Sequence, residues 1–319
     1  MITKNLALAR DVLVQDGIVA IPTETVYGLA GNAYSETAVK QIFGLKKRPF
    51  FNPLILHIKS MECLHSVAKE IPEAAFKLAS NFWPGALTLV LKKQGHISDL
   101  VTSGMDTVAV RVPNHPVALK LLEQLDFPLA APSANPFGSI SPTTAQHVHH
   151  YFEETLSIIL DGGACEKGIE STIIGFENDE PILYRHGAVS IEEIEKVVGK
   201  IKTVTEKSDK PKAPGMLSRH YAPNTETHLV TNISESIHSF SDKKIGLLLF
   251  KEKNSDSQDC LFQEVLSTTG DFDEAARNVY AALHRLDLSD VDVILVEKLP
   301  DIGIGKSIND RLKRAVKKE

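Results

Sequence analysis

The sequence lacks the features of a secreted, membrane-spanning or thiolate-metal protein. Its three cysteines, Cys63, Cys165 and Cys260, form no CxxC pair, which argues against a disulfide framework or a cysteine metal site. No apolar run approaches the roughly 20 residues that cross a bilayer. Arg10 and Asp11 interrupt the apolar positions of the N-terminal segment, which therefore does not match a signal peptide. We expect a cytoplasmic protein with no membrane association.

A net positive charge and several familiar catalytic motifs are also absent. The net charge is −6, which argues against a general nucleic-acid coat and leaves phosphate recognition to local clusters. HExxH, GxSxG and a complete Walker A motif are absent. Residues 300–307 imitate the end of Walker A, but a proline stands where its first glycine should be. The histidines of residues 147–150 have no carboxylate or cysteine at ligand spacing, so we expect no metal site in the protein itself.

Hydrophobic patterning divides the chain into three parts. Residues 1–199 mix strand and helix patterns, and because strand patterns outnumber helical ones, we expect a twisted mixed sheet. Residues 200–226 hold three prolines, many polar groups and no periodic apolar face, which predicts a linker. Residues 227–319 alternate strand and helix, which predicts a smaller, Rossmann-like domain with parallel strands. The expected fold class is α/β.

Capping residues indicate where several helices begin. Thr3 is predicted to cap a helix that runs to Gly17, where a glycine suits the position after the helix. Ser35 is predicted to open the next helix. Ser190 and Glu193 have the spacing of a capping box and indicate a helix near the end of the first part.

Polar side chains gather at the ends of the apolar strand patterns. Thr23 belongs to a polar run after the strand pattern of residues 18–22, and such a run is costly unless its groups have partners. Pro49 and Pro53 stiffen the loop that follows Lys46 and contains Arg48, so these cations should be held in place. Held cations suit a polyphosphate. Taken alone, the first segment could be a self-capped turn and the second an exposed basic loop.

One arginine of the first part lies in a strand pattern, beside an expected buried surface. Thr107 and Arg111 lie four residues apart in a strand pattern, so their side chains share one face of the sheet. Because Val110 and Val112 flank the arginine, its charge must meet an anion, either an internal carboxylate or a ligand. Further polar side chains lie near strand ends or in proline-broken loops: Ser133, Asn135, Ser139, Ser141, Ser171 and Arg185.

The order of these segments resembles the YrdC-like family of threonylcarbamoyl-AMP synthases. The segments that carry the resemblance are PTETVYGL, KKRPFFNPL, FWPGALTLVL, VAVRVP, APSANPFGSISPT, GIESTII and YRHG. Two later segments, APGMLSRHYAP and GIGKSINDRLKRA, resemble the linker and the end of the long, two-domain form. The resemblance therefore spans nearly the whole chain.

The resemblance implies a nucleotidyltransferase. The family joins L-threonine, bicarbonate or CO₂, and ATP, with Mg²⁺, into threonylcarbamoyl-AMP and pyrophosphate. The product serves the threonylcarbamoyladenosine modification of tRNA, so the implied partner is a downstream threonylcarbamoyl transferase. By the same resemblance, residues 1–199 are a YrdC-like catalytic domain, residues 200–226 cover its active site and residues 227–319 form a small C-terminal domain.

The resemblance also implies the residues of the site. At ATP it places Lys46, Lys47, Arg48, Pro49, Phe50, Thr107, Ser133, Asn135, Ser141 and Arg185. At L-threonine it places Thr23, His57, Arg111, Ala131 and Ser171. Lys46 and Arg48 are the expected catalytic residues, and Ala131 can contribute only backbone atoms. In the linker, Arg219, His220 and Tyr221 match the segment that lies over the site.

Two other functions fit part of the pattern. A sheet with a basic edge could bind double-stranded RNA, at least weakly, through Lys46, Lys47 and Arg48. That function does not explain the polar groups at Thr23 and His57. A carbamoyl transferase acting on a maturation protein uses the same type of domain. Such proteins usually carry zinc-binding cysteine modules and an acylphosphatase part, and this chain has neither.

Overall fold

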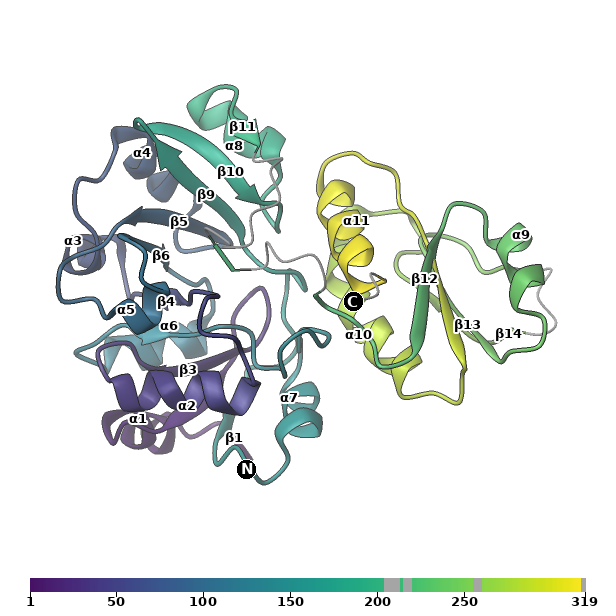
Figure 1. Cartoon of the computed structure of the whole chain (residues 1–319), viewed down its shortest axis with the longest axis horizontal. Coiled ribbons are helices and arrows are strands. Elements are labelled where there is room, and N and C mark those ends of the chain that lie inside the picture. The colour runs from purple at the N-terminus through teal and green to yellow at the C-terminus, as the bar shows by residue number, and fades with distance from the viewer. Residues whose placement is uncertain (204–212, 215–219, 255–259, 317–319) are drawn as a thin grey trace. The chain divides into compact units, whose positions relative to one another are not determined.

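The computed structural model describes residues 1–203, 213–214, 220–254 and 260–316, which form two compact units (Figure 1). The first unit comprises residues 1–137, 142–166 and 170–217, and the second comprises residues 138–141, 167–169 and 218–319. Two short segments from within the predicted catalytic domain thus belong to the second unit. Arg219 of the predicted linker lies outside the described residues.

The first unit is built on one mixed sheet with the strand order β1-β8-β2-β3-β7-β4-β6-β5-β9-β10-β11. Parallel pairs such as β4–β6 and β5–β9 alternate with antiparallel pairs such as β5–β6 and β9–β10. The predicted mixed sheet is therefore confirmed. Its strands are β1 (Ile2–Thr3), β2 (Ile18–Ile21), β3 (Gly28–Asn32), β4 (Ile55–His57), β5 (Leu87–Lys92), β6 (Thr107–Arg111), β7 (Leu129–Ala130), β8 (Ile159–Leu160), β9 (Thr172–Glu177), β10 (Glu180–Arg185) and β11 (Lys202–Thr203).

Helices in the first unit begin largely where capping residues predicted them. The Ser35 side chain accepts a hydrogen bond from the Ala38 N–H, and Ser190 with Glu193 forms the predicted capping box. The helices are α1 (Leu6–Val14), α2 (Glu36–Lys46), α3 (Leu64–Val67), α4 (Glu73–Phe82), α5 (Asp99–Thr102), α6 (Pro116–Glu123), α7 (Ala145–Phe152) and α8 (Ile191–Val198), and a 3₁₀ turn, η1, spans Met61–Cys63.

The prediction for the first helix was wrong at both ends. Thr3 lies in β1, where it pairs with Leu160 of β8, and Asn5 caps the helix by accepting from the N–H groups of Ala7 and Leu8. The helix ends at Val14 with Gln15 as its C-cap, so Gly17 lies two residues beyond the cap and not directly after it. Long-range strand pairing therefore takes the residue that the local signal assigned to a cap.

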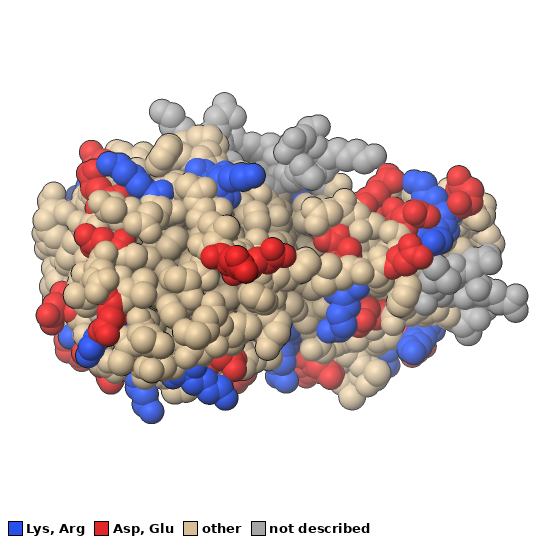
Figure 2. Space-filling model, turned by 90° about the horizontal axis from the view of Figure 1, so that it is seen from below, with Lys and Arg blue, Asp and Glu red and all other residues tan. Residues whose placement is uncertain are grey.

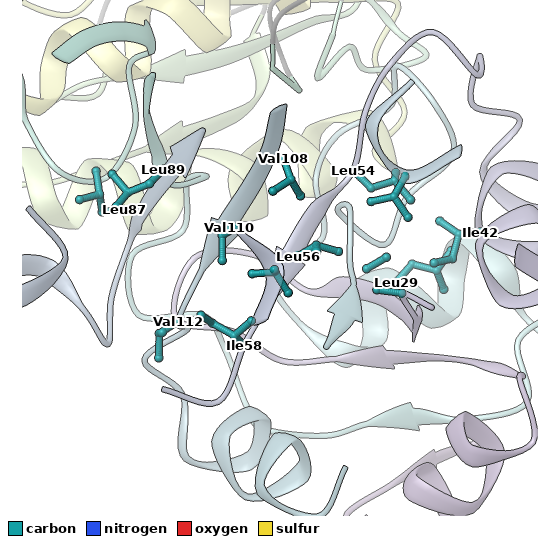
Figure 3. Packing of buried hydrophobic residues seen from close by; sticks show 14 of the residues in the cluster. Leu29, Ile42, Leu54, Leu56, Ile58, Leu87, Leu89, Val108, Val110 and Val112 are labelled. Atoms are coloured by element: carbon teal, nitrogen blue, oxygen red, sulfur yellow. The ribbon is translucent and has the colours of Figure 1, made fainter. Parts of the chain in front are cut away.

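The main core and the predicted site use opposite faces of β6. Val108 and Val110 pack with Leu56 and Leu89 in the buried cluster of Figure 3. Because neighbouring strand residues point to opposite faces, the intervening Thr107, Ala109 and Arg111 face away from that core. On this other face, a small buried cluster joins Ala109 to Ile55, Val90, Ile173 and, from the predicted linker, Ala213. A linker residue therefore covers the sheet face that carries Arg111.

The second unit confirms the predicted small α/β domain. Its four strands are all parallel in the order β12-β15-β13-β14. The elements are β12 (Glu226–Val230), α9 (Ile233–Ile237), a 3₁₀ turn η2 (His238–Phe240), β13 (Ile245–Leu249), β14 (Cys260–Val265), α10 (Phe272–Asp287), β15 (Val293–Glu297) and α11 (Ile304–Ala315). Among the helices that the structure describes, none is long and apolar enough to cross a bilayer.

We expect Leu56→Ala to destabilise the first unit strongly, because Leu56 is fully buried in its main core. A cavity at such a site costs about 2–5 kcal/mol. The control is Leu8→Ala on α1, where the side chain is 41% exposed and the expected change is within about 0.5 kcal/mol. Urea unfolding followed by the fluorescence of Trp83, the single tryptophan, measures both. Equal midpoints for the two variants would contradict the assigned core.

Candidate functional site

Arg111 is a buried cation at the end of β6, held by three contacts. Its Nε donates to the Gly85 carbonyl at 3.0 Å, and its Nη1 donates to the Thr25 hydroxyl at 2.9 Å. Its Nη2 lies 2.5 Å from a carboxylate oxygen of Glu24, and both side chains are only 4% exposed. Of the two anions that the sequence left open for Arg111, the structure shows the internal carboxylate.

The polar run after β2 wraps around this ion pair. The Thr23 hydroxyl donates to the Val26 carbonyl at 2.6 Å and lies 2.8 Å from the Thr25 hydroxyl. Thr23 also accepts hydrogen bonds from the N–H groups of Thr25 and Val26. The segment is thus a turn capped by its own hydroxyls, and the same hydroxyls connect Thr23 through Thr25 to Arg111. The segment can therefore be a self-capped turn and still contribute Thr23 to a binding site.

His57 faces Arg111 from the neighbouring strand, since the two residues pair in register between β4 and β6. The ring is buried, and among the described residues its Nδ1 has no hydrogen-bond partner. Burial, followed by the Arg111 charge, lowers the pKa of His57 to about 3. At neutral pH the ring is therefore uncharged, and its Nδ1 is available for a hydrogen bond to a ligand.

Ser171 and Arg185 form a second group next to the first. The Arg185 guanidinium donates to the Ser171 carbonyl at 2.8 Å and to its hydroxyl at 3.2 Å. The Ser171 hydroxyl also lies 2.7 Å from that of the buried Thr88. The N–H of Thr172 binds the Ala86 carbonyl, one residue from the carbonyl that holds Arg111. The two groups therefore adjoin at the start of β5.

Linker residues contact this second group. Arg185 Nη1 donates to the Pro214 carbonyl at 3.1 Å, next to Ala213 in the small cluster on the sheet face. The other described residues of the predicted covering segment, His220 and Tyr221, pack within the second unit: Tyr221 contacts the ring of Tyr280 on α10. That His220 and Tyr221 cover the site stays a prediction.

Lys46 is buried at the last turn of α2. Its ammonium donates to the carbonyls of Ser133 and Asn135 at 2.6 and 2.5 Å. Burial, followed by the Arg48 charge, lowers the pKa of Lys46 well below its usual 10.5. Since Ser133 bridges to Gly28, which follows the turn of residues 23–27, Lys46 lies beside the same loop that surrounds Arg111.

Arg48 confirms that the proline-stiffened loop holds its cations. Its Nε donates to the Asn52 carbonyl at 3.0 Å, and its Nη2 donates to the Asn52 side chain and the Pro53 carbonyl, both at 2.7 Å. Arg48 is buried, whereas Lys47 and Phe50 on the same loop are exposed. Pro49, between them, is half-buried.

Three of the predicted site residues, Thr107, Ser141 and Ala131, take no part in the contacts described so far. Thr107 begins β6, about 13 Å along the strand from Arg111, and lines a pocket of about 790 Å³ with Lys92 and Tyr184. Ser141 is buried and belongs to the second unit. The Ala131 N–H already donates to the Ile55 carbonyl at 3.0 Å, which leaves only the carbonyl of Ala131 for a ligand.

Sequence reasoning assigned no site role to two side chains that hold the site together, Glu24 and Thr88. Glu24 belongs to the polar run after the strand of residues 18–21, which was expected to need partners, but its pairing with Arg111 was not predicted. Thr88 gave no signal, since a threonine in a strand pattern is ordinary. Across the described residues, no three histidine, cysteine, aspartate or glutamate side chains are grouped as metal ligands.

Comparisons with known proteins agree over the whole chain. A family model for Sua5, YciO and YrdC, described as telomere recombination, matches residues 11–187. A model described as the C-terminal domain of threonylcarbamoyl-AMP synthase matches residues 189–316. The chain is 45% identical to the threonylcarbamoyl-AMP synthase of Pyrococcus abyssi, with 98% of this chain and 94% of the relative covered. It is 39% identical to that of Bacillus subtilis, with 98% and 92% covered.

A solved structure matches as well. The crystal structure of P. abyssi Sua5 complexed with L-threonine superposes with a TM-score of 0.91 at 43% identity. The match covers 98% of this chain and 94% of that chain.

The neutral state of His57 predicts a pH dependence of stability. With a folded pKa of about 3 and an ordinary value near 6.5, only the unfolded chain binds this proton between those pH values. The free energy of unfolding should therefore fall as the pH drops from 6.5 towards 3, by up to about 1.4 kcal/mol per pH unit.

The effect of His57 can be isolated with His57→Gln. Between pH 7 and pH 5, the wild type should lose about 2 kcal/mol more than this variant in urea unfolding. An identical loss in the two proteins would show that His57 titrates normally in the folded state.

Proposed function

The chain belongs to the threonylcarbamoyl-AMP synthase family, and from this premise we propose that its buried cations join L-threonine and ATP into threonylcarbamoyl-AMP. The enzyme is of the nucleotidyltransferase type and makes an adenylate for tRNA modification. Its carbon source is bicarbonate or CO₂, and its product is consumed by a threonylcarbamoyl transferase. We place the reaction in the cytoplasm.

One observation carries the assignment of the site: Arg111 and Lys46, both buried, lie beside the turn of residues 23–27 and the start of β3 that follows it. L-Threonine binds at Arg111 with Thr23, His57, Ser171 and the carbonyl of Ala131. The triphosphate binds at Lys46 and Arg48. The remaining nucleotide contacts come from Lys47, Pro49, Phe50, Thr107, Ser133, Asn135, Ser141 and Arg185.

We place ATP along the sheet face between the two ends of β6, where the linker residue Ala213 packs against Ala109. Thr107 and Arg111 share this face about 13 Å apart, a separation that suits an extended nucleotide whose phosphates point toward threonine. The small side chain of Ala109 stands between them. With the nucleoside near Thr107, the α-phosphate would approach the threonine end of the strand.

The reaction needs position and charge rather than an enzyme nucleophile. The threonine ammonium first loses a proton to water, and the neutral amine then adds to CO₂ and releases a second proton to form a carbamate. A carbamate oxygen attacks the α-phosphorus of ATP. The bond to the β-phosphate breaks, and its electron pair leaves with pyrophosphate. Alignment of the two reactants can lower the barrier by about 7–11 kcal/mol. Lys46, Arg48 and Arg185 stabilise the charge that develops on the phosphates.

Mg²⁺ enters as a partner of ATP. It is a hard cation that keeps several waters and binds substrate phosphates through few protein ligands. The predicted nucleotide residues fit that role, because their polar side chains are cations, hydroxyls and one amide, Asn135, rather than a cage of carboxylates. Bound Mg²⁺ supplies charge neutralisation on the triphosphate, and Asn135 would offer it an amide oxygen.

A covering linker protects the intermediate. A carbamate loses CO₂ readily in water, so excluding water favours the forward reaction. Ala213 is buried on the sheet face that carries Arg111, and Pro214 accepts a hydrogen bond from Arg185. These contacts support the proposal that the segment of residues 200–226 covers the substrates.

The charge distribution does not favour RNA binding as the main function. On the face shown in Figure 2, acidic and basic side chains are interspersed over the described residues. A protein that binds double-stranded RNA needs a basic surface that follows the phosphates. Lys47 is exposed, but Lys46 and Arg48 are buried and engaged with backbone carbonyls. RNA binding, if present, would be weak and sensitive to salt.

Lys46→Met should lower threonine-dependent pyrophosphate release about 100-fold or more, because it removes a buried donor from the triphosphate. The control is Lys40→Met on the same helix, α2, where the lysine is exposed and paired with Glu36. Steady-state pyrophosphate release with ATP, Mg²⁺, bicarbonate and L-threonine measures both. Near-normal turnover by a folded Lys46→Met protein would contradict the role of Lys46.

The product itself tests the proposed function. Mass spectrometry of the same mixture should show AMP carrying threonine plus CO₂, and chelation of Mg²⁺ should abolish it. Release of pyrophosphate without such an adduct would contradict the proposal.

A further inference from the structure

Glu24 is a buried carboxylate with too few partners. It is buried, and its contact with Arg111 uses one carboxylate oxygen. Within the described residues, the other oxygen, Oε2, has no hydrogen-bond partner. Burying a carboxylate is costly unless hydrogen bonds satisfy its remaining lone pairs. The unsatisfied oxygen therefore marks a place for a polar group that the protein does not supply.

Arg111 shows the complementary pattern. Three contacts hold it, to Gly85, Thr25 and Glu24, and a guanidinium has more N–H groups than these contacts use. The nearby His57 is uncharged at neutral pH. The pair of Glu24 and Arg111 therefore presents one negative and one positive group side by side in a buried setting.

We propose that Glu24 binds the ammonium group of L-threonine while Arg111 binds its carboxylate. This inference rests on the proposed function and assigns Glu24 a substrate-binding role. A free α-amino acid carries an ammonium and a carboxylate on the same carbon. Two neighbouring side chains of opposite charge, such as Glu24 and Arg111, can therefore bind both groups. An ammonium on Oε2 supplies the missing hydrogen-bond donors, and a carboxylate on Arg111 uses its remaining N–H groups.

The assignment gives the site its selectivity and orients the reacting atom. A buried carboxylate favours ligands that bring a positive charge and disfavours analogues that leave it unpaired. Hydroxy acids and N-blocked amino acids would be rejected at this position. The amine that must take up CO₂ is held on the side of Thr23 and Glu24, at a fixed distance from the carboxylate end.

The test compares two ligands in two proteins. L-Threonine and 3-hydroxybutyrate differ by the amine alone, and Glu24→Gln removes the charge of the side chain while keeping its shape. By calorimetry, the variant should bind L-threonine about 30-fold or more weakly but bind 3-hydroxybutyrate at least as well as the wild type does. Glu36→Gln, at an exposed carboxylate on α2, is the matched control and should change neither affinity.

The outcomes separate the two levels of the proposal. If Glu24→Gln weakens both ligands equally, Glu24 only orients Arg111 and the inference is wrong. If the wild type binds no L-threonine, the proposed function itself fails. If Glu24→Gln does not fold, as judged by Trp83 fluorescence, Glu24→Asp replaces it in the test. Aspartate keeps the negative charge but is one methylene shorter, so the carboxylate lies farther from the ligand. Glu24→Asp should lower the preference for L-threonine over 3-hydroxybutyrate, and an unchanged preference would also overturn the inference.

Discussion

The ion pair between Arg111 and Glu24 is the interaction on which the site depends. A permanent positive charge ends a strand whose other face packs in the main core, so the chain must bring an anion to it. The turn of residues 23–27 supplies that anion, and its threonine hydroxyls complete the cage. The turn leads into Gly28, which forms a β-bridge with Ser133, and the Ser133 carbonyl accepts a hydrogen bond from Lys46.

This arrangement explains why no catalytic dyad is needed. The buried cations are each fixed by backbone or side-chain oxygens: Lys46 by two carbonyls, Arg48 by its own loop and Arg185 by Ser171. Fixed charges in a water-poor setting stabilise a transition state without reorganising. Burying these charges is unfavourable, and the packing of the main core on the opposite face of β6 offsets that free energy. Under the proposed function, this scaffold positions L-threonine and ATP for direct transfer.

Local patterns predicted much of the fold, and long-range pairing decided the rest. Ser35 and Ser190 were identified as caps because their partners lie three residues away. Thr3 was misassigned because β1 pairs with β8, far along the chain. Face sharing between Thr107 and Arg111 followed from strand geometry, but the anion at Arg111 stayed open, since Glu24 is distant in sequence.

The most direct measurement of the central claim is a crystal structure of this chain with L-threonine and a non-hydrolysable ATP analogue. The account predicts the threonine carboxylate on Arg111 and the α-phosphate near Lys46, close enough for a carbamate oxygen to reach phosphorus. Threonine bound away from Arg111, or phosphates bound away from Lys46, would contradict it.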